Sequence, residues 1–232
     1  MIDIRPAAER FHTDFGWLDS RHSFSFGHHR DPSNTHHGLL LVSNDDRVGP
    51  GGGFGTHPHE NMEIVTWVLE GELEHRDSAG HEGVISPGLA QRMSAGSGVV
   101  HSEMNHSSTE SVHFVQMWVP PDVHDIDPGY EQRDLNDALA TGELTVVASG
   151  HGREGGVTIH QNDAMLYAAR PSVDQTLQLP AAPHVHVFVP RGSVRLEGRE
   201  LAPGDAARLT DHESVTVVAT GPDTEILVWV TA

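Results

Sequence analysis

Short apolar segments recur along the chain and end at glycine, proline or aspartate. They are rich in valine, isoleucine, threonine and aromatic residues, a composition typical of strands in antiparallel sheets. Few stretches repeat with the 3.6-residue period of a helix. The pattern therefore predicts an all-β fold of the sandwich or barrel type. The clearest segments cover residues 38–44, 62–71, 83–88, 111–119, 143–150, 156–161, 185–198, 213–221 and 225–230.

One stretch carries the signals of a short helix. Residues 134–142 begin at Asp134, a residue type that caps helix N-termini, and end at Gly142, a common stop signal. We expect a single short helix here, between strands.

The chain also contains a weak internal repeat. Residues 67–88 and 187–204 each have a strand, a glycine turn, a second strand, a spacer and a final Pro-Gly. Such a repeat suggests one β-barrel unit used twice. Residues 119–135, rich in proline, aspartate and glycine, form the natural linker. We therefore expect an N-terminal barrel in residues 1–122 and a C-terminal barrel in residues 134–232.

Composition excludes several classes of function. The chain has 14 basic and 33 acidic residues, a net charge of −19, and no basic cluster, so direct binding of nucleic acid is not expected. The absence of cysteine excludes disulfides and thiolate metal sites. No apolar run approaches the length of a membrane span, and the N-terminus lacks the apolar core of a signal peptide. We expect a soluble, cytoplasmic protein.

Two pairs of candidate ligands stand out among the 19 histidines. Residues two apart on a strand share a face, so His57 and His59 point the same way, as do His101 and Glu103. If the two strands are neighbours, three imidazoles and one carboxylate converge. Such a set suits Fe(II), Mn(II), Ni(II), Cu(II) or Zn(II) and leaves coordination positions open for a substrate and O2 or water.

An isolated His-x-His in a histidine-rich chain is more often incidental, and the chain supplies an example. His184 and His186 have the same spacing but lie closer to their turn glycine than His57 does. In the register of the first unit, the corresponding positions hold Gln178 and Pro180, and the position of His101 holds Val217. We expect the second barrel to bind no metal.

The segments around both ligand pairs resemble the two cupin motifs, and among cupins the chain is most similar to the pirin family. The pirin-like segments are "GWLDSRHSFSF", "GFGTHPHENMEIVTWVLEGELEHRDS" and "RMSAGSGVVHSEMN", and similarity is strongest over residues 14–119. The second motif departs from the general pattern, with Ala90 and Gly96 in place of glycine and proline. The matching motif positions are Gly51, His57, His59, Glu63 and Gly71, then Gly98, His101 and Asn105.

The resemblance implies two cupin barrels in one chain, with a metal in the N-terminal barrel. The implied ligands are His57, His59, His101 and Glu103, and the implied metal is Fe(II), although the same ligands would accept Mn, Ni, Cu, Co or Zn. Glu63 is a ligand in many cupins but not in pirins. It could instead orient an imidazole of the site, or it could be a partly exposed strand residue.

The resemblance also implies an activity. Bacterial pirins of this kind are similar to quercetin 2,3-dioxygenases, which open the flavonol heterocycle with O2 and release carbon monoxide. In that reaction Glu103 would be the catalytic base, and the partners would be a flavonol or related polyphenol and O2. Two alternatives remain open: an iron-binding regulatory or redox-sensing protein that acts through protein partners, and a cupin enzyme for another enol. We expect a monomer, with any protein partners unknown.

The residues of the substrate pocket cannot be assigned from the sequence. Packing in the barrel core is the more common role of large apolar side chains beside a cupin site. His113 and Gln116 lie on opposite faces of one strand, so at most one of them points inward. The aromatic and methionine candidates are Phe54, Met62, Trp67, Met93, Met104, Phe114, Met117 and Trp118.

Overall fold

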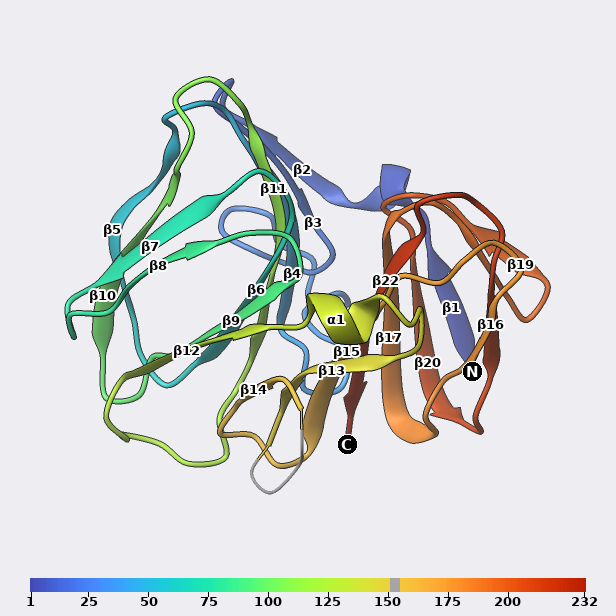
Figure 1. Cartoon of the computed structure of the whole chain (residues 1–232). Helices are drawn as coiled ribbons and strands as arrows, with labels where there is room; N and C mark the ends of the chain where they lie inside the picture. The colour runs from blue at the N-terminus through green and yellow to red at the C-terminus, as the bar shows by residue number, and fades with distance from the viewer. Residues whose placement is uncertain (151–154) are drawn as a thin grey trace.

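The computed structural model describes residues 1–150 and 155–232, which form two β-barrels side by side (Figure 1). The all-β, two-barrel architecture expected from the sequence is confirmed. Among the described residues, no helix has the length and apolar character needed to cross a membrane.

The first barrel consists of a seven-stranded sheet facing a four-stranded sheet. The larger sheet has the order β12-β9-β6-β11-β4-β3-β2, and the smaller has the order β5-β10-β7-β8. The strands are β2 (Phe11–Asp14), β3 (Leu18–His22), β4 (Val42–Val48), β5 (Gly53–His59), β6 (Glu63–Glu70), β7 (Leu73–Asp77), β8 (Glu82–Ile85), β9 (Leu89–Ser94), β10 (Val99–Asn105), β11 (Val112–Val119) and β12 (Gly129–Asp134).

The second barrel repeats this plan, with sheets ordered β1-β20-β17-β22-β15-β13-β14 and β16-β21-β18-β19. Strands β6, β7 and β8 correspond in order to β17, β18 and β19, as the internal repeat predicts. The strands are β1 (Ile2–Arg5), β13 (Thr145–Ser149), β14 (Val157–Thr158), β15 (Ala164–Ala169), β16 (Thr176–Gln178), β17 (Ala182–Arg191), β18 (Val194–Leu196), β19 (Arg199–Leu201), β20 (Ala206–His212), β21 (Thr216–Ala219) and β22 (Glu225–Thr231).

The chain crosses between the barrels at points that the sequence did not indicate. The N-terminal strand β1, blue in Figure 1, pairs with β20 of the second barrel, and the 3₁₀ turn η1 (Ala7–Glu9) then leads back to the first. The expected linker, 119–135, contains β12, which pairs with β9. Strand β1 covers the edge of the second barrel's large sheet, and β12 covers the corresponding edge in the first barrel. Without these strands, the backbone groups of β20 and β9 on that side would be unpaired.

The expected helix over 134–142 is reduced to one turn, α1 (Asn136–Leu139). Asp134 is the last residue of β12, where it pairs with Leu89, and its side chain accepts a hydrogen bond from the Asn136 N–H. Gly142 ends the segment with φ of +76°, as the stop signal predicts. The strand pairing of Asp134 shortens the helix at its start.

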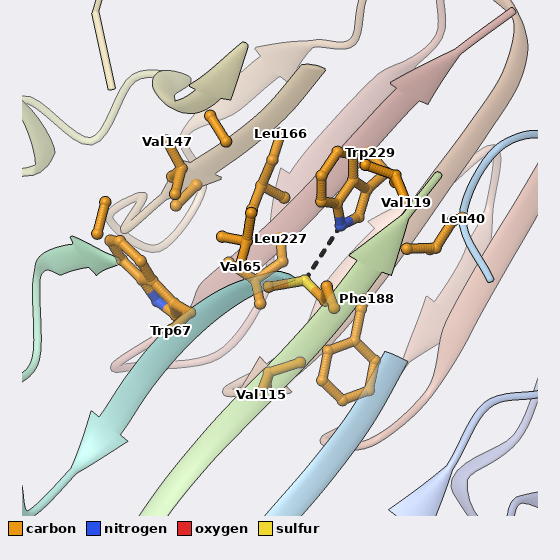
Figure 2. Packing of buried hydrophobic residues seen from close by; sticks show 14 of the residues in the cluster. Leu40, Val65, Trp67, Val115, Val119, Val147, Leu166, Phe188, Leu227 and Trp229 are labelled. Carbon is orange, nitrogen blue, oxygen red and sulfur yellow. Dashed lines mark hydrogen bonds between the residues drawn. The ribbon is translucent and has the colours of Figure 1, made fainter. Parts of the chain in front are cut away.

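The barrels share one hydrophobic core, which explains why β6 and β11 are apolar on both faces (Figure 2). On β6, Val65 and Trp67 point out of the first barrel into one cluster with Leu166 and Trp229 of the second. Two hydrogen bonds cross this core: the Trp67 indole donates to Glu225 at 2.7 Å, and the Trp229 indole donates to the sulfur of Met117 at 3.1 Å.

We predict that truncation of this shared core destabilises the protein strongly. Leu166→Ala removes a side chain with no exposed surface and should lower the free energy of unfolding by about 2–5 kcal/mol, measured by urea denaturation. Val173→Ala, at a position that is 51% exposed, is the control and should change it by less than about 0.5 kcal/mol. Equal effects of the two substitutions would contradict the shared core.

Candidate metal centre

Strands β5 and β10 are adjacent and antiparallel, which meets the condition set by the sequence for convergence of the ligand pairs. His57 lies directly opposite His101, and His59 lies two residues along the same strand. One ring nitrogen from each of these three histidines lies within 4.8 Å of the other two. The three imidazoles therefore meet at one point, on side chains held by neighbouring strands.

Hydrogen bonds on the far side of two rings determine which nitrogen faces this point. The Nδ1–H of His57 donates to the Gly55 carbonyl at 2.8 Å. The carboxylate of Asp77 accepts from Nε2–H of His75 at 3.2 Å, which leaves the His75 Nδ1 as an acceptor. The Nδ1–H of His101 donates to it at 3.3 Å. In both His57 and His101, Nε2 is then left without a proton.

The exposed lone pairs fit a bound cation. The Nε2 atoms of His57 and His101 are 3.0 Å apart, although neither has a proton to share. Two ligand nitrogens at right angles and about 2.1 Å from a metal would be about 3.0 Å apart. The Nε2 of His59 is buried and has no hydrogen-bond partner among the described residues. A divalent metal ion would satisfy all three nitrogens.

Two of the three imidazoles lie in surroundings that favour the neutral form, which is the form that binds a metal. Burial, with a smaller contribution from His57, lowers the pKa of His59 to about 4. Burial and the surrounding imidazoles lower the pKa of His101 to about 2. Competition from protons at His59 and His101 is therefore weak at pH 7.

Glu103 faces the same cavity but does not belong to the group of three converging nitrogens. A register shift between His101 and Glu103 offsets it along β10, so that it lies opposite Phe54. Gln116 donates to both carboxylate oxygens, at 2.9 and 2.7 Å. Burial raises the pKa of Glu103, and the bonds from Gln116 partly oppose this rise.

Glu63 takes neither of the two roles that the sequence left open. It is 1% exposed, so it is not a partly exposed strand residue. Its carboxylate accepts a hydrogen bond from Ser94 at 2.8 Å and lies 3.3 Å from Nδ1 of His160 in the second barrel. Glu63 therefore positions an imidazole of the neighbouring barrel rather than one of the candidate ligands.

The second His-x-His pair lies on β17, which corresponds to β6 and not to the ligand strand β5. The rings of His184 and His186 lie 5.1 and 6.4 Å from that of His37. Among the described residues, the only group with ring nitrogens or carboxylates close enough to share a metal is the one in the first barrel.

A cavity of about 440 Å³ opens onto His57 and His59, a size typical of sites for small ligands. Phe54 and Trp118 line it, together with Phe15, Trp17 and Phe26. The other aromatic and methionine candidates do not line it: Trp67 and Met117 lie in the shared core, Phe114, Met62 and Met93 in smaller clusters, and Met104 beside a separate surface pocket.

The sequence analysis missed the polar residues of the barrel interior. His75 and Asp77 orient His101, while Ser20, His22, Asn44 and Asp46 line the cavity. The available signal was the alternation of polar residues in "LDSRH", "VSNDDRV" and "LEHRD", where residues two apart share a face. A search for apolar runs identifies strands, but it does not show that some polar residues of those strands face the barrel interior.

Named proteins resemble this chain over nearly its whole length. A protein of Mycobacterium tuberculosis, provisionally named as a quercetin 2,3-dioxygenase, is 55% identical over 98% of this chain and 94% of its own length. The quercetin 2,3-dioxygenase of Escherichia coli strain K12 is 40% identical over 99% of this chain and 98% of its own length.

Among solved structures, the bacterial pirin YhhW of Escherichia coli in complex with nickel(II) matches with a TM-score of 0.92. It shares 39% sequence identity and covers 100% of this chain and 99% of its own length. The model of the quercetinase C-terminal cupin domain matches residues 146–229, and the pirin model matches residues 4–119. The chain belongs to the pirin family.

Proposed function

We propose that this pirin is a metal-dependent dioxygenase that opens the heterocycle of flavonols such as quercetin with O2 and releases carbon monoxide. The main support is the convergence of three imidazole nitrogens beside a cavity with aromatic walls. The names of the relatives support the same reaction.

In this proposal His57, His59, His101 and Glu103 hold one divalent metal ion, with Fe(II) as the first candidate. The metal would lower the pKa of the flavonol 3-hydroxyl on coordination, as it does for bound water. The nickel complex of a relative supports a metal in this fold, although the ligand set itself accepts several ions.

The protein residues bind and orient the flavonol and remove its proton. Glu103 accepts the proton of the 3-hydroxyl, and the burial that raises its pKa makes it a stronger base. Gln116 holds the carboxylate in place and is itself held by the Trp118 indole, which donates to its oxygen at 3.0 Å. Phe26 and Trp118, in edge-to-face contact, offer an apolar wall to the planar ligand and exclude water.

We predict that metal binding depends on the first-barrel ligands and not on the histidine pair of the second barrel. The purified protein reconstituted with Fe(II) or Ni(II) should hold one ion per chain, measured by elemental analysis. His101→Ala should hold less than about a tenth of that amount, because the cluster loses one of its three converging imidazoles. His184→Ala is the matched control and should bind as the unmodified protein does. Retention of metal by His101→Ala with loss in His184→Ala would refute the assignment.

We also predict turnover of flavonols by the metal-loaded protein. With quercetin and O2, the iron-loaded protein should release one carbon monoxide per flavonol consumed. Bleaching of the chromophore measures the flavonol, and gas analysis measures the carbon monoxide. Glu103→Gln should lower kcat by about 100-fold or more, since it removes the base. His184→Ala should leave kcat unchanged. Absence of flavonol turnover with Fe, Mn, Ni, Cu, Co and Zn would exclude the proposed activity.

A further inference from the structure

One wall of the cavity is polar, which is unusual for the interior of a small barrel. Ser20 and His22 on β3 lie opposite Asp46 and Asn44 on β4, and all four side chains line the cavity. Each of these residues is less than 5% exposed. Burial of polar groups destabilises a fold unless they form hydrogen bonds, so a cluster of this kind requires an explanation.

Hydrogen bonds within the wall hold its side chains in fixed orientations. The Ser20 hydroxyl donates a short hydrogen bond to Oδ1 of Asp46. The His22 Nδ1–H donates to Oδ1 of Asn44 at 2.9 Å, and the Thr13 hydroxyl donates to Nε2 of His22 at 3.1 Å. The ring of Phe26 stacks on His22 with centroids 5.2 Å apart. The wall is therefore a built, rigid surface.

Two polar atoms of this wall are left over. No described residue donates to Oδ2 of Asp46, and none accepts from Nδ2 of Asn44. The wall thus offers an acceptor and a donor on the same face of β4. Burial raises the pKa of Asp46 to about 7, which shows how incompletely its carboxylate is solvated. A phenolic hydroxyl, which both donates and accepts, matches this pair.

The wall lies at a suitable distance from the metal centre. Asn44 pairs with Gln116 of β11, the residue that holds Glu103, and β3 is the next strand beyond β4. Adjacent strands are about 4.8 Å apart, so the wall begins about 5 Å from Gln116 and extends to about 10 Å. A planar molecule of three rings can span this interval while its reacting ring stays beside Glu103.

We propose that Asp46 and Asn44 form a subsite that binds phenolic hydroxyl groups on the outer rings of the flavonol, away from the reacting heterocycle. Ser20 and His22 are positioning residues for this subsite. The inference rests on the proposed flavonol reaction and adds a specificity. The site selects flavonols with hydroxyl groups on the outer rings over flavonols without them.

The test compares two ligands on the metal-free protein by equilibrium titration. Quercetin carries hydroxyls on both outer rings, whereas 3-hydroxyflavone carries none. Asp46→Ala should weaken quercetin binding about 10-fold or more and 3-hydroxyflavone binding less than 2-fold, because hydrogen bonds to charged groups are lost with only one ligand. Asp46→Asn, which keeps the shape and the Ser20 contact, is the second variant and should give an intermediate loss.

Asp19→Asn is the matched control, because it removes the same charge from the exposed outer face of β3. It should leave binding of both ligands unchanged. Equal weakening of quercetin and 3-hydroxyflavone by Asp46→Ala, or no weakening of either, would overturn the subsite.

Turnover separates the subsite from the reaction itself. In the iron-loaded protein, Asp46→Ala should raise the KM for quercetin about 10-fold and change kcat less than about 3-fold. If the unmodified protein turns over neither flavonol but Asp46→Ala still weakens quercetin selectively, the subsite stands and the dioxygenase proposal fails. If turnover is present and the selective effect is not, the reaction stands and the subsite fails.

Discussion

The antiparallel pairing of β5 with β10 is the interaction on which the candidate site depends. It places His57 opposite His101 and brings their unprotonated Nε2 atoms to 3.0 Å, with the buried Nε2 of His59 in the same group. Lone pairs held this close repel one another unless a cation lies between them. The strand register therefore forms the candidate metal centre without help from a bound ion.

The second barrel fixes the register of the facing sheet, which contains β6 and β11, from outside. The residues of β6 and β11 that point away from the cavity, among them Val65, Trp67 and Met117, are buried against β15 and β22. A slip of one residue in either strand would turn these side chains into the cavity and expose the polar ones to the shared core. Contact with the second barrel thus stabilises the strand that supplies Gln116 to the site.

Much of this arrangement could be predicted from the sequence because it depends on local periodicity. The spacing of His57 and His59 gives their common face, and the repeat gives the second barrel. The pairing of β1 with β20 could not be predicted, because the sequence of Ile2–Arg5 is equally compatible with an edge of the first barrel and an edge of the second. Asp46 and His75 were missed because only the folded barrel shows that their strand faces enclose a cavity.

Comparison of the two barrels shows what the polar interior costs. In the second barrel, Leu177 on β16 pairs with Val217 on β21, the two strands that correspond in sheet order to β5 and β10, and both residues belong to a single large apolar core. In the first barrel the apolar residues of the interior divide into two smaller clusters around the cavity. When imidazoles and carboxylates occupy the centre of a barrel, less apolar area is buried there. The core shared with its neighbour restores that area, so the second barrel serves the site by stabilising the barrel that contains it.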